Sequence, residues 1–163
     1  MKKITTLLLA AALTIITSCS TISTAEASSY ASLDAEIILL KNGDYIETTI
    51  SDVPVLSSGF SVLSTASTVT KKKTTYCKNE NGTVLWSVAI TATFTYDGTT
   101  SKCTSYSHST TCPSKAWEIK SASSSKNGNS ATAKATATKF IDGTTTDITR
   151  IVTITCSKNG TVS

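Results

Sequence analysis

The feature that most constrains the fold is a run of strict alternation from residue 86 to residue 96. Apolar residues take every second position from Trp86 to Tyr96, and Ser, Ala or Thr fill the positions between them. Successive side chains of a β-strand point to opposite faces of the sheet, so one face of this run is apolar and the other is rich in hydroxyl groups. Asp97-Gly98, a pair typical of tight hairpin turns, ends the run. The sequence therefore predicts a long strand with one buried face.

Comparable strand-like segments flank this run, separated by Asn-Gly or Asp-Gly turn signals. Together the predicted strands cover residues 68–77, 83–96, 99–108, 116–120, 130–140 and 144–156. Short strands with regular turns between them favour an antiparallel sandwich or barrel. We predict one all-β domain over residues 68–163, an immunoglobulin-like antiparallel β-sandwich of about six to seven strands. The side chains expected to fill its core are Trp86, Val88, Ile90, Phe94, Tyr96, Trp117, Ile119, Val152 and Ile154.

Residues 28–67 show no comparable pattern. The apolar run from Ile37 to Leu40 is too short to classify by period, and Pro54 argues against a central strand. Residues 57–67 are rich in serine, a composition typical of linkers. We predict an extended leader over 28–67 that lies on the domain.

The first 27 residues have the pattern of an export signal. Lys2 and Lys3 precede an apolar run over 4–16, which is shorter than the roughly 20 residues that a membrane-spanning helix needs. Cleavage after Ala25-Glu26-Ala27 would release a secreted protein that begins at residue 28. Alternatively, residues 16–19 resemble a lipobox, and lipidation of Cys19 would anchor the protein to the cell envelope.

Four cysteines follow the signal, and in an exported protein they are expected to form disulfides. If each hairpin reverses the chain, Cys77 and Cys112 lie at one end of the domain and Cys103 and Cys156 at the other. We therefore predict the pairs Cys103–Cys156 and Cys77–Cys112. A local Cys103–Cys112 bridge, with Cys77 joined to Cys156, is the main alternative.

The charge balance argues against a nucleic-acid-binding protein. After position 27 the chain has 13 basic and 10 acidic residues, a net charge of +3, and its lysines are dispersed except at Lys71-Lys72-Lys73. A nucleic-acid surface requires a clustered basic stripe with aromatic residues among it. Charged lysines of this kind are typical of a solvated strand edge that resists aggregation.

His108 is the only histidine, and it lies between Cys103 and Cys112. A cysteine–histidine catalytic pair requires a free thiolate, and a closed zinc site would use these three residues with Cys77 as the fourth ligand. Disulfide formation in an exported chain explains the cysteines better. We therefore predict no catalytic residue, no metal site and no cofactor.

Acidic residues could act as a carboxyl pair in glycoside cleavage, and exposed aromatic rings could bind sugars. Asp97 and Asp142 lie in Asp-Gly turns, where they support the turn locally, and Glu118 and Asp147 lie in strand-like segments. Trp86 and Trp117 share parity with aliphatic residues, which favours the core, so Tyr106 is the better candidate for an exposed binding ring.

Several residues recur in one order in a known family of proteins. These are Trp86-Ser87-Val88, Thr93-Phe94-Thr95-Tyr96-Asp97-Gly98, Cys103, Trp117, Gly128-Asn129 and the segment from Thr153 to Gly160. The pattern resembles small exported proteins of Gram-positive bacteria, which have a signal peptide and a C-terminal all-β module of uncharacterised function. The resemblance covers roughly residues 68–163 and implies no activity and no catalytic residue. Cys103 and Cys156 belong to the shared pattern, whereas Cys77 and Cys112 are additional here.

These observations predict a non-enzymatic extracellular or cell-envelope module for adhesion or recognition. Its expected partner is an extracellular protein or glycan, with no nucleic acid, and it would meet a membrane only through a lipid on Cys19. A secreted hydrolase or carbohydrate-processing protein is the alternative from another class. A secreted effector or antimicrobial protein is a second alternative, weakly supported by the positive charge.

Overall fold

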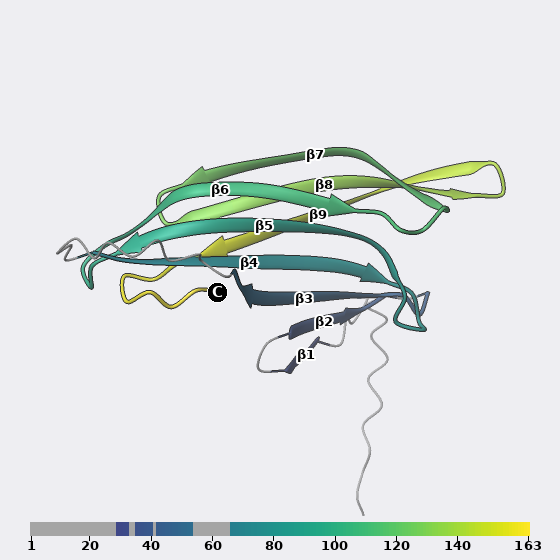
Figure 1. Ribbon diagram of the computed structural model, residues 1–163. Coiled ribbons are helices and arrows are strands. Elements are labelled where there is room, and N and C mark those ends of the chain that lie inside the picture. The colour runs from purple at the N-terminus through teal and green to yellow at the C-terminus, as the bar shows by residue number, and fades with distance from the viewer. Residues whose placement is uncertain (1–28, 33–34, 41, 54–65) are drawn as a thin grey trace, which may run out of the picture.

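The computed structural model describes residues 29–32, 35–40, 42–53 and 66–163 (Figure 1). The signal over 1–27, the lipidation candidate Cys19 and most of the serine-rich linker lie outside the described residues. No helix within the described ranges is long and apolar enough to cross a membrane.

Nine strands make up the described part of the chain. In order they are β1 (Ser29–Ser32), β2 (Ala35–Leu39), β3 (Tyr45–Asp52), β4 (Ser67–Lys78), β5 (Val84–Tyr96), β6 (Ser101–Thr111), β7 (Trp117–Asn127), β8 (Ser130–Ile141) and β9 (Thr144–Thr155). Strand β5 contains the alternating run from Trp86 to Tyr96. Asp97-Gly98 and Asp142-Gly143 lie between antiparallel neighbours, where the aspartate–glycine pairs predicted hairpins.

The strands form two antiparallel sheets that pack face to face as a sandwich (Figure 1). One sheet has the order β1-β2-β3-β4-β5-β6 and the other β7-β8-β9, so every hydrogen-bonded neighbour is also consecutive in the chain. The all-β, two-sheet prediction is therefore confirmed. Immunoglobulin-like sandwiches connect their sheets by Greek-key crossings, in which sequence neighbours change sheets. The consecutive order leaves the immunoglobulin-like topology unconfirmed.

Part of the predicted leader belongs to the first sheet. β3 pairs with β4 over eight positions, from Tyr45 opposite Lys78 to Asp52 opposite Lys71. β2 pairs with β3 in turn, so residues 35–39 and 45–52 extend the sheet and do not lie loosely on the domain. These strands could not be predicted from the sequence, because the apolar run in β2 is short and β3 is mostly polar.

The position of β4 also corrects the interpretation of the three consecutive lysines. Lys71, Lys72 and Lys73 are half-buried in a strand that has β3 on one side and β5 on the other, so they do not mark a sheet edge. The Lys71 ammonium lies 2.5 Å from the carboxylate of Asp52, its partner across the strands. These lysines therefore pair with a neighbouring strand, and they do not protect a free edge.

The core lies between β5 of the first sheet and the inner face of the second. Seven predicted core residues are buried, and Tyr96 and Ile119 are partly buried and pack against the same cluster. β8 opposes the large side chains of β5 with a row of small ones: Ala131, Ala133, Ala135 and Ala137. Alanine removes bulk from one sheet, so the sheets approach closely while the rings of the other sheet fill the space.

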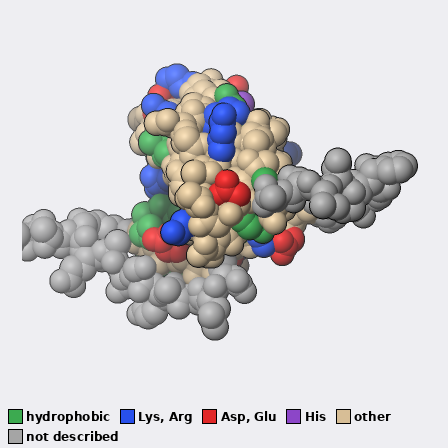
Figure 2. All heavy atoms as spheres, turned by 90° about the vertical axis from the view of Figure 1, so that its left-hand side faces the viewer, with side chains coloured by type: hydrophobic (Ala, Val, Ile, Leu, Met, Phe, Trp, Pro, Cys, Tyr) green, Lys and Arg blue, Asp and Glu red, His purple; other side chains and the backbone are tan. Residues whose placement is uncertain are grey.

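The two sheets are also joined along the side where β6 and β7 lie. The Lys126 ammonium on β7 donates to the carbonyl oxygens of Cys103 and Thr104, at 3.1 and 2.9 Å. His108 Nδ1 lies 2.8 Å from Ser124 Oγ on β7. These side chains link two edge strands that share no backbone ladder. Seen end-on from the side of the Cys103 end, the surface consists mostly of uncharged polar groups and backbone, with basic side chains in separate places (Figure 2).

Gly160 supports the C-terminal segment in a way that can be tested. It has φ +85°, and a Cβ atom there would lie 2.6 and 2.8 Å from Cε2 and Cε1 of Tyr96. Gly98 has the same backbone conformation, φ +84°, with no atom within 4 Å of an added Cβ. We expect Gly98→Ala to cost about 1 kcal/mol of unfolding free energy because an L-residue is strained there.

Gly160→Ala should cost about 1–3 kcal/mol more, since it adds steric overlap to the same backbone strain. Urea denaturation followed by circular dichroism measures both values. Equal losses for the two variants would contradict the close packing of Gly160 on Tyr96.

Candidate functional site

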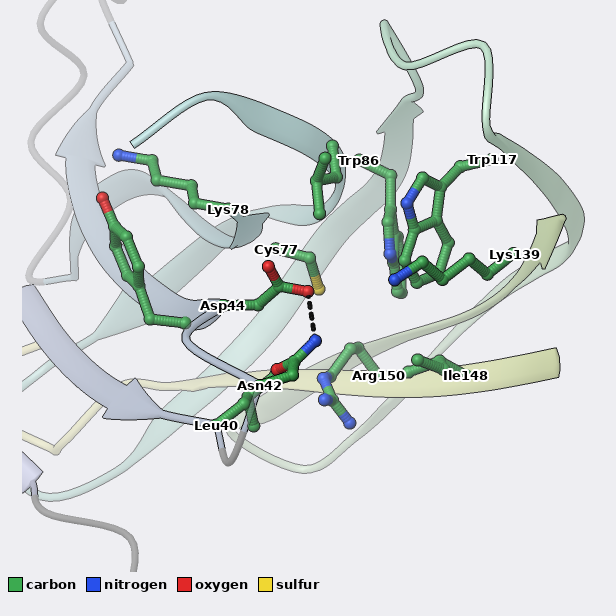
Figure 3. Close-up of a pocket in the computed structure, with 12 residues that line it drawn as sticks. Leu40, Asn42, Asp44, Cys77, Lys78, Trp86, Trp117, Lys139, Ile148 and Arg150 are labelled. Atoms are coloured by element: carbon green, nitrogen blue, oxygen red, sulfur yellow. Dashed lines mark hydrogen bonds between the residues drawn. The ribbon is translucent and has the colours of Figure 1, made fainter. Parts of the chain in front are cut away.

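A pocket opens between the sheets at the end where β4 finishes and β5 begins (Figure 3). Its volume is about 150 Å³, and its walls come from the β2–β3 connection, β4, β5, β7, β8 and β9. Engineered apolar cavities of about 150 Å³ bind benzene. The pocket is therefore large enough for a group the size of one six-membered ring.

Two tryptophans form the inner wall of the pocket. Trp86 and Trp117 have ring centroids 6.2 Å apart and planes inclined by 38°. Trp86 is completely buried, and its Nε1 has no hydrogen-bond partner in the described part of the chain. A buried indole N–H normally has a partner. The two rings thus give the pocket an apolar inner wall, and the unpartnered indole N–H lies within the core behind it.

Two cations occupy core-facing positions beside this wall. Lys139 continues the inward row of β8 beyond Ala137, and its ammonium lies 5.5 Å from the Trp117 ring centroid. Arg150 stands in the inward row of β9 between Ile148 and Val152. Its Nη1 donates to the Thr149 carbonyl oxygen at 3.1 Å. Burial of an unpaired cation is unfavourable, so its position here requires an explanation.

Neither cation has an acidic partner. The ion pairs found in the described ranges do not include Lys139 or Arg150. Arg150 Nε is buried, and its N–H donates to no described residue. A guanidinium has five N–H donors in a planar fork, and several of them remain available here.

The charges on the opposite wall are already matched. The Lys78 ammonium forms an ion pair with Glu47, and this hydrogen bond raises the pKa of Lys78. The same ammonium lies 5.9 Å from the ring centroid of Tyr45. Asp44 accepts a hydrogen bond from the Asn42 side chain at 2.7 Å, shown dashed in Figure 3. Setting Asp44 against Lys139 and Arg150 leaves the pocket with one uncompensated positive charge.

Cys77 also lines the pocket, with its sulfur near Arg150 in Figure 3. Burial raises the pKa of the Cys77 thiol, and the Arg150 guanidinium opposes part of that effect. The thiol is therefore protonated near neutral pH. A nucleophilic cysteine requires the thiolate, so Cys77 acts here as a small apolar wall residue.

The structure corrects the predicted Cys77–Cys112 disulfide. The four cysteines of the described residues are free, and three of them are buried. Cys77 on β4 pairs with Trp86 on β5, and Cys112 follows the residue of β6 that pairs with Ser87. The two cysteines do lie at one end of the sheet, but β5 separates them. Two strand spacings are about 9–10 Å, beyond the roughly 7 Å limit for a disulfide.

Cys103 and Cys156 lie together at the opposite end of the sandwich. Their backbone N–H groups donate to adjacent residues of the β7–β8 turn, Gly128 O at 2.9 Å and Asn129 O at 3.0 Å. Both side chains belong to the buried core cluster. No disulfide joins them, and burial raises the pKa of the Cys103 thiol. The Cys103–Cys156 pairing is unconfirmed and stays a prediction.

The proposed ligands of a zinc site are not brought together. Within the described residues, no group of three or more histidine, cysteine, aspartate or glutamate side chains is placed to hold a metal ion. His108 is exposed on β6, whereas Cys103 on the same strand is buried. Tyr106, the candidate binding ring, is 38% exposed and lies outside the pocket.

The four acidic residues that are candidates for hydrolysis lie in two turns and in one cross-strand row of the second sheet. Asp97 accepts hydrogen bonds from the backbone N–H groups of Thr100 and Thr99, which lower its pKa. Asp147 pairs with Lys120 at 2.5 Å, and this contact lowers its pKa. Asp142 occupies the β8–β9 turn with φ 46°, and Glu118 is exposed on β7. Glu118 and Asp147 both lie opposite Thr138, so β8 separates them within one row, whereas Asp97 and Asp142 each lie in their own turn.

Sequence reasoning missed the two cations of the pocket. Arg150 interrupts the apolar row Ile148, Val152 and Ile154, and Lys139 ends the alanine row of β8. A charge on the buried parity of a strand is the signal that would have identified them, because such a residue must find a partner or a ligand.

Comparison with protein-family models, curated proteins and solved structures finds no match.

Proposed function

We propose that this protein is a non-enzymatic recognition module that acts outside the cell or at the cell envelope. It holds part of an extracellular partner, a ring-sized group, in the pocket between its sheets. The observation that carries the proposal is the unused hydrogen-bonding capacity of the pocket. The Arg150 guanidinium and the Lys139 ammonium line the pocket, and neither has an acidic partner among the described residues. Leaving two such donors unsatisfied is costly, and a bound group would satisfy them.

The alternative hydrolytic function has less support. Glycoside hydrolysis by the usual route uses two carboxyl groups that flank the scissile bond. The pocket contains one carboxylate, that of Asp44, which is already hydrogen-bonded to Asn42. The walls thus supply donors for binding, without the pair of acids that would supply chemistry.

Titration with two ring-sized probes tests the proposal. Benzoate and benzamide would be added to the protein while tryptophan fluorescence and the unfolding temperature are recorded. We expect saturable binding of at least one probe, and its loss in Ile148→Trp, which fills the pocket from β9. Ile151→Trp is the matched control, because Ile151 is on the same strand but 61% exposed and outside the pocket. Binding that survives Ile148→Trp, or no binding of either probe, would overturn the proposal.

The site of action is proposed from the sequence alone. The export pattern before residue 28 and the lipobox at Cys19 support release or anchoring at the envelope. Mass spectrometry of the mature protein in culture medium and in membrane fractions distinguishes them. A mature chain that begins at residue 28 means release, and a lipid on Cys19 means anchoring. An unprocessed chain beginning at Met1 would contradict export.

A further inference from the structure

We propose that the pocket is specific for a monoanionic carboxylate carried on a small apolar body. This inference rests on the proposed function, since it names the chemistry of the group that the pocket holds. The residues that would recognise the carboxylate are Arg150 and Lys139, the two cations that line the pocket without an acidic partner.

The direction of the hydrogen bonds supports an anion. The two cationic groups that line the pocket, the Arg150 guanidinium and the Lys139 ammonium, are hydrogen-bond donors with no acidic partner among the described residues. A ligand that satisfies them must present acceptors. An ionised carboxylate has two oxygens that only accept, and a planar guanidinium can meet both of them at once.

The charge balance sets the charge of the ligand. Lys78 is neutralised by Glu47, so Lys139 and Arg150 face Asp44 alone. The remaining positive charge matches one carboxylate, whereas a phosphate dianion would leave the pocket with excess negative charge. A neutral ligand would leave the cations without a counterion in a partly buried site.

The apolar walls set the nature of the rest of the ligand. Beside the donors, the pocket is lined by Trp86, Trp117, Leu40, Leu85 and Ile148. A volume of about 150 Å³ admits one ring with a carboxylate attached. An apolar ring would bury its surface against these walls, whereas the hydroxyl groups of a sugar would lose their water without new partners.

A titration of the full-length protein with three probes tests the inference. Benzoate has the proposed chemistry, benzamide has the same shape without the charge, and glucuronate has the charge on a sugar. We expect benzoate to bind at least about tenfold more tightly than either of the others, because a charge-assisted hydrogen bond is roughly twice as strong as a neutral one. Equal or tighter binding of benzamide would overturn the requirement for an anion and leave the recognition function standing. Tighter binding of glucuronate would overturn the apolar body.

Variants of the cations separate recognition from folding. Arg150→Gln should weaken benzoate binding about tenfold or more while leaving benzamide binding nearly unchanged, and Arg150→Lys should restore part of the loss. Lys134→Gln is the control, because Lys134 is an exposed cation on β8 outside the pocket. If Arg150→Gln does not fold, Lys139→Gln provides the same comparison. Benzoate affinity that is unchanged in a folded Arg150→Gln or Lys139→Gln protein would overturn the assignment.

Discussion

Replacing Trp86 with alanine is expected to lower the unfolding free energy by about 3–5 kcal/mol, the usual cost of truncating a buried aromatic side chain. Trp86 has no exposed surface, and its ring packs against Trp117 of the other sheet. The truncation therefore removes contacts on both sides of the sandwich. A domain of this size has a total stability of about 5–15 kcal/mol, so the variant should be partly or fully unfolded at 37 °C. Urea denaturation followed by circular dichroism is the appropriate measurement, because the variant lacks one fluorophore.

Tyr106→Ala provides the control for Trp86→Ala. Tyr106 also carries an aromatic ring, but it is 38% exposed on the edge strand β6, where Lys126 lies 5.9 Å from its ring centroid. Its truncation should cost less than about 1 kcal/mol, since little buried surface is lost. Native-like stability of Trp86→Ala would mean that the ring lies on a surface and that the sandwich is assembled differently.

Replacing Ala135 with leucine should lower the unfolding free energy by about 1–3 kcal/mol. Ala135 lies in the middle of the alanine row of β8 and is completely buried against the core cluster. The row is where the second sheet approaches β5, and a leucine there requires the sheets to separate or neighbouring side chains to leave their rotamers. Thermal and urea unfolding of the variant measure the cost.

Lys134→Leu is the matched control for this overpacking. Lys134 is the preceding residue of β8 and points to the opposite, exposed face. The same leucine at this position should change the unfolding free energy by less than about 0.5 kcal/mol. A larger loss at Lys134 than at Ala135 would mean that β8 presents its other face to the core.

The local part of the fold was predictable from the sequence. The six strands β4 to β9 coincide closely with the six predicted segments, and the largest difference is the longer extent of β7. Alternation and turn pairs act within a few residues, so they indicate strand and turn without knowledge of the partners. The polar strand β3 and the short strand β2 were not predicted because β3 depends on pairing with β4, and β2 on pairing with β3.

The candidate site was much less predictable. Parity along the strands assigned two of its residues, Trp86 and Trp117, to the core. It did not identify Lys139 and Arg150 as pocket residues. A pocket requires residues from the β2–β3 connection and from both sheets to meet. A short-range sequence pattern cannot predict this pocket, because it is lined by residues about one hundred positions apart in the chain, such as Leu40 and Arg150.

The cysteines show the same division. The sequence correctly places Cys77 and Cys112 at one end and Cys103 and Cys156 at the other, because hairpins reverse the chain at each turn. Only the tertiary structure places β5 between Cys77 and Cys112 and brings Cys103 and Cys156 to one turn from two different sheets.

By itself, then, the sequence determined the strands, their turns and the parity that buries one face of β5. The tertiary structure decided how the strands divide between two sheets, and that Arg150 and Lys139 reach the interior beside an unpartnered indole N–H. The physical reason is the distance along the chain over which each interaction acts. Side-chain alternation is fixed by the backbone of a single strand, whereas sheet pairing and the shape of a pocket depend on packing between distant segments.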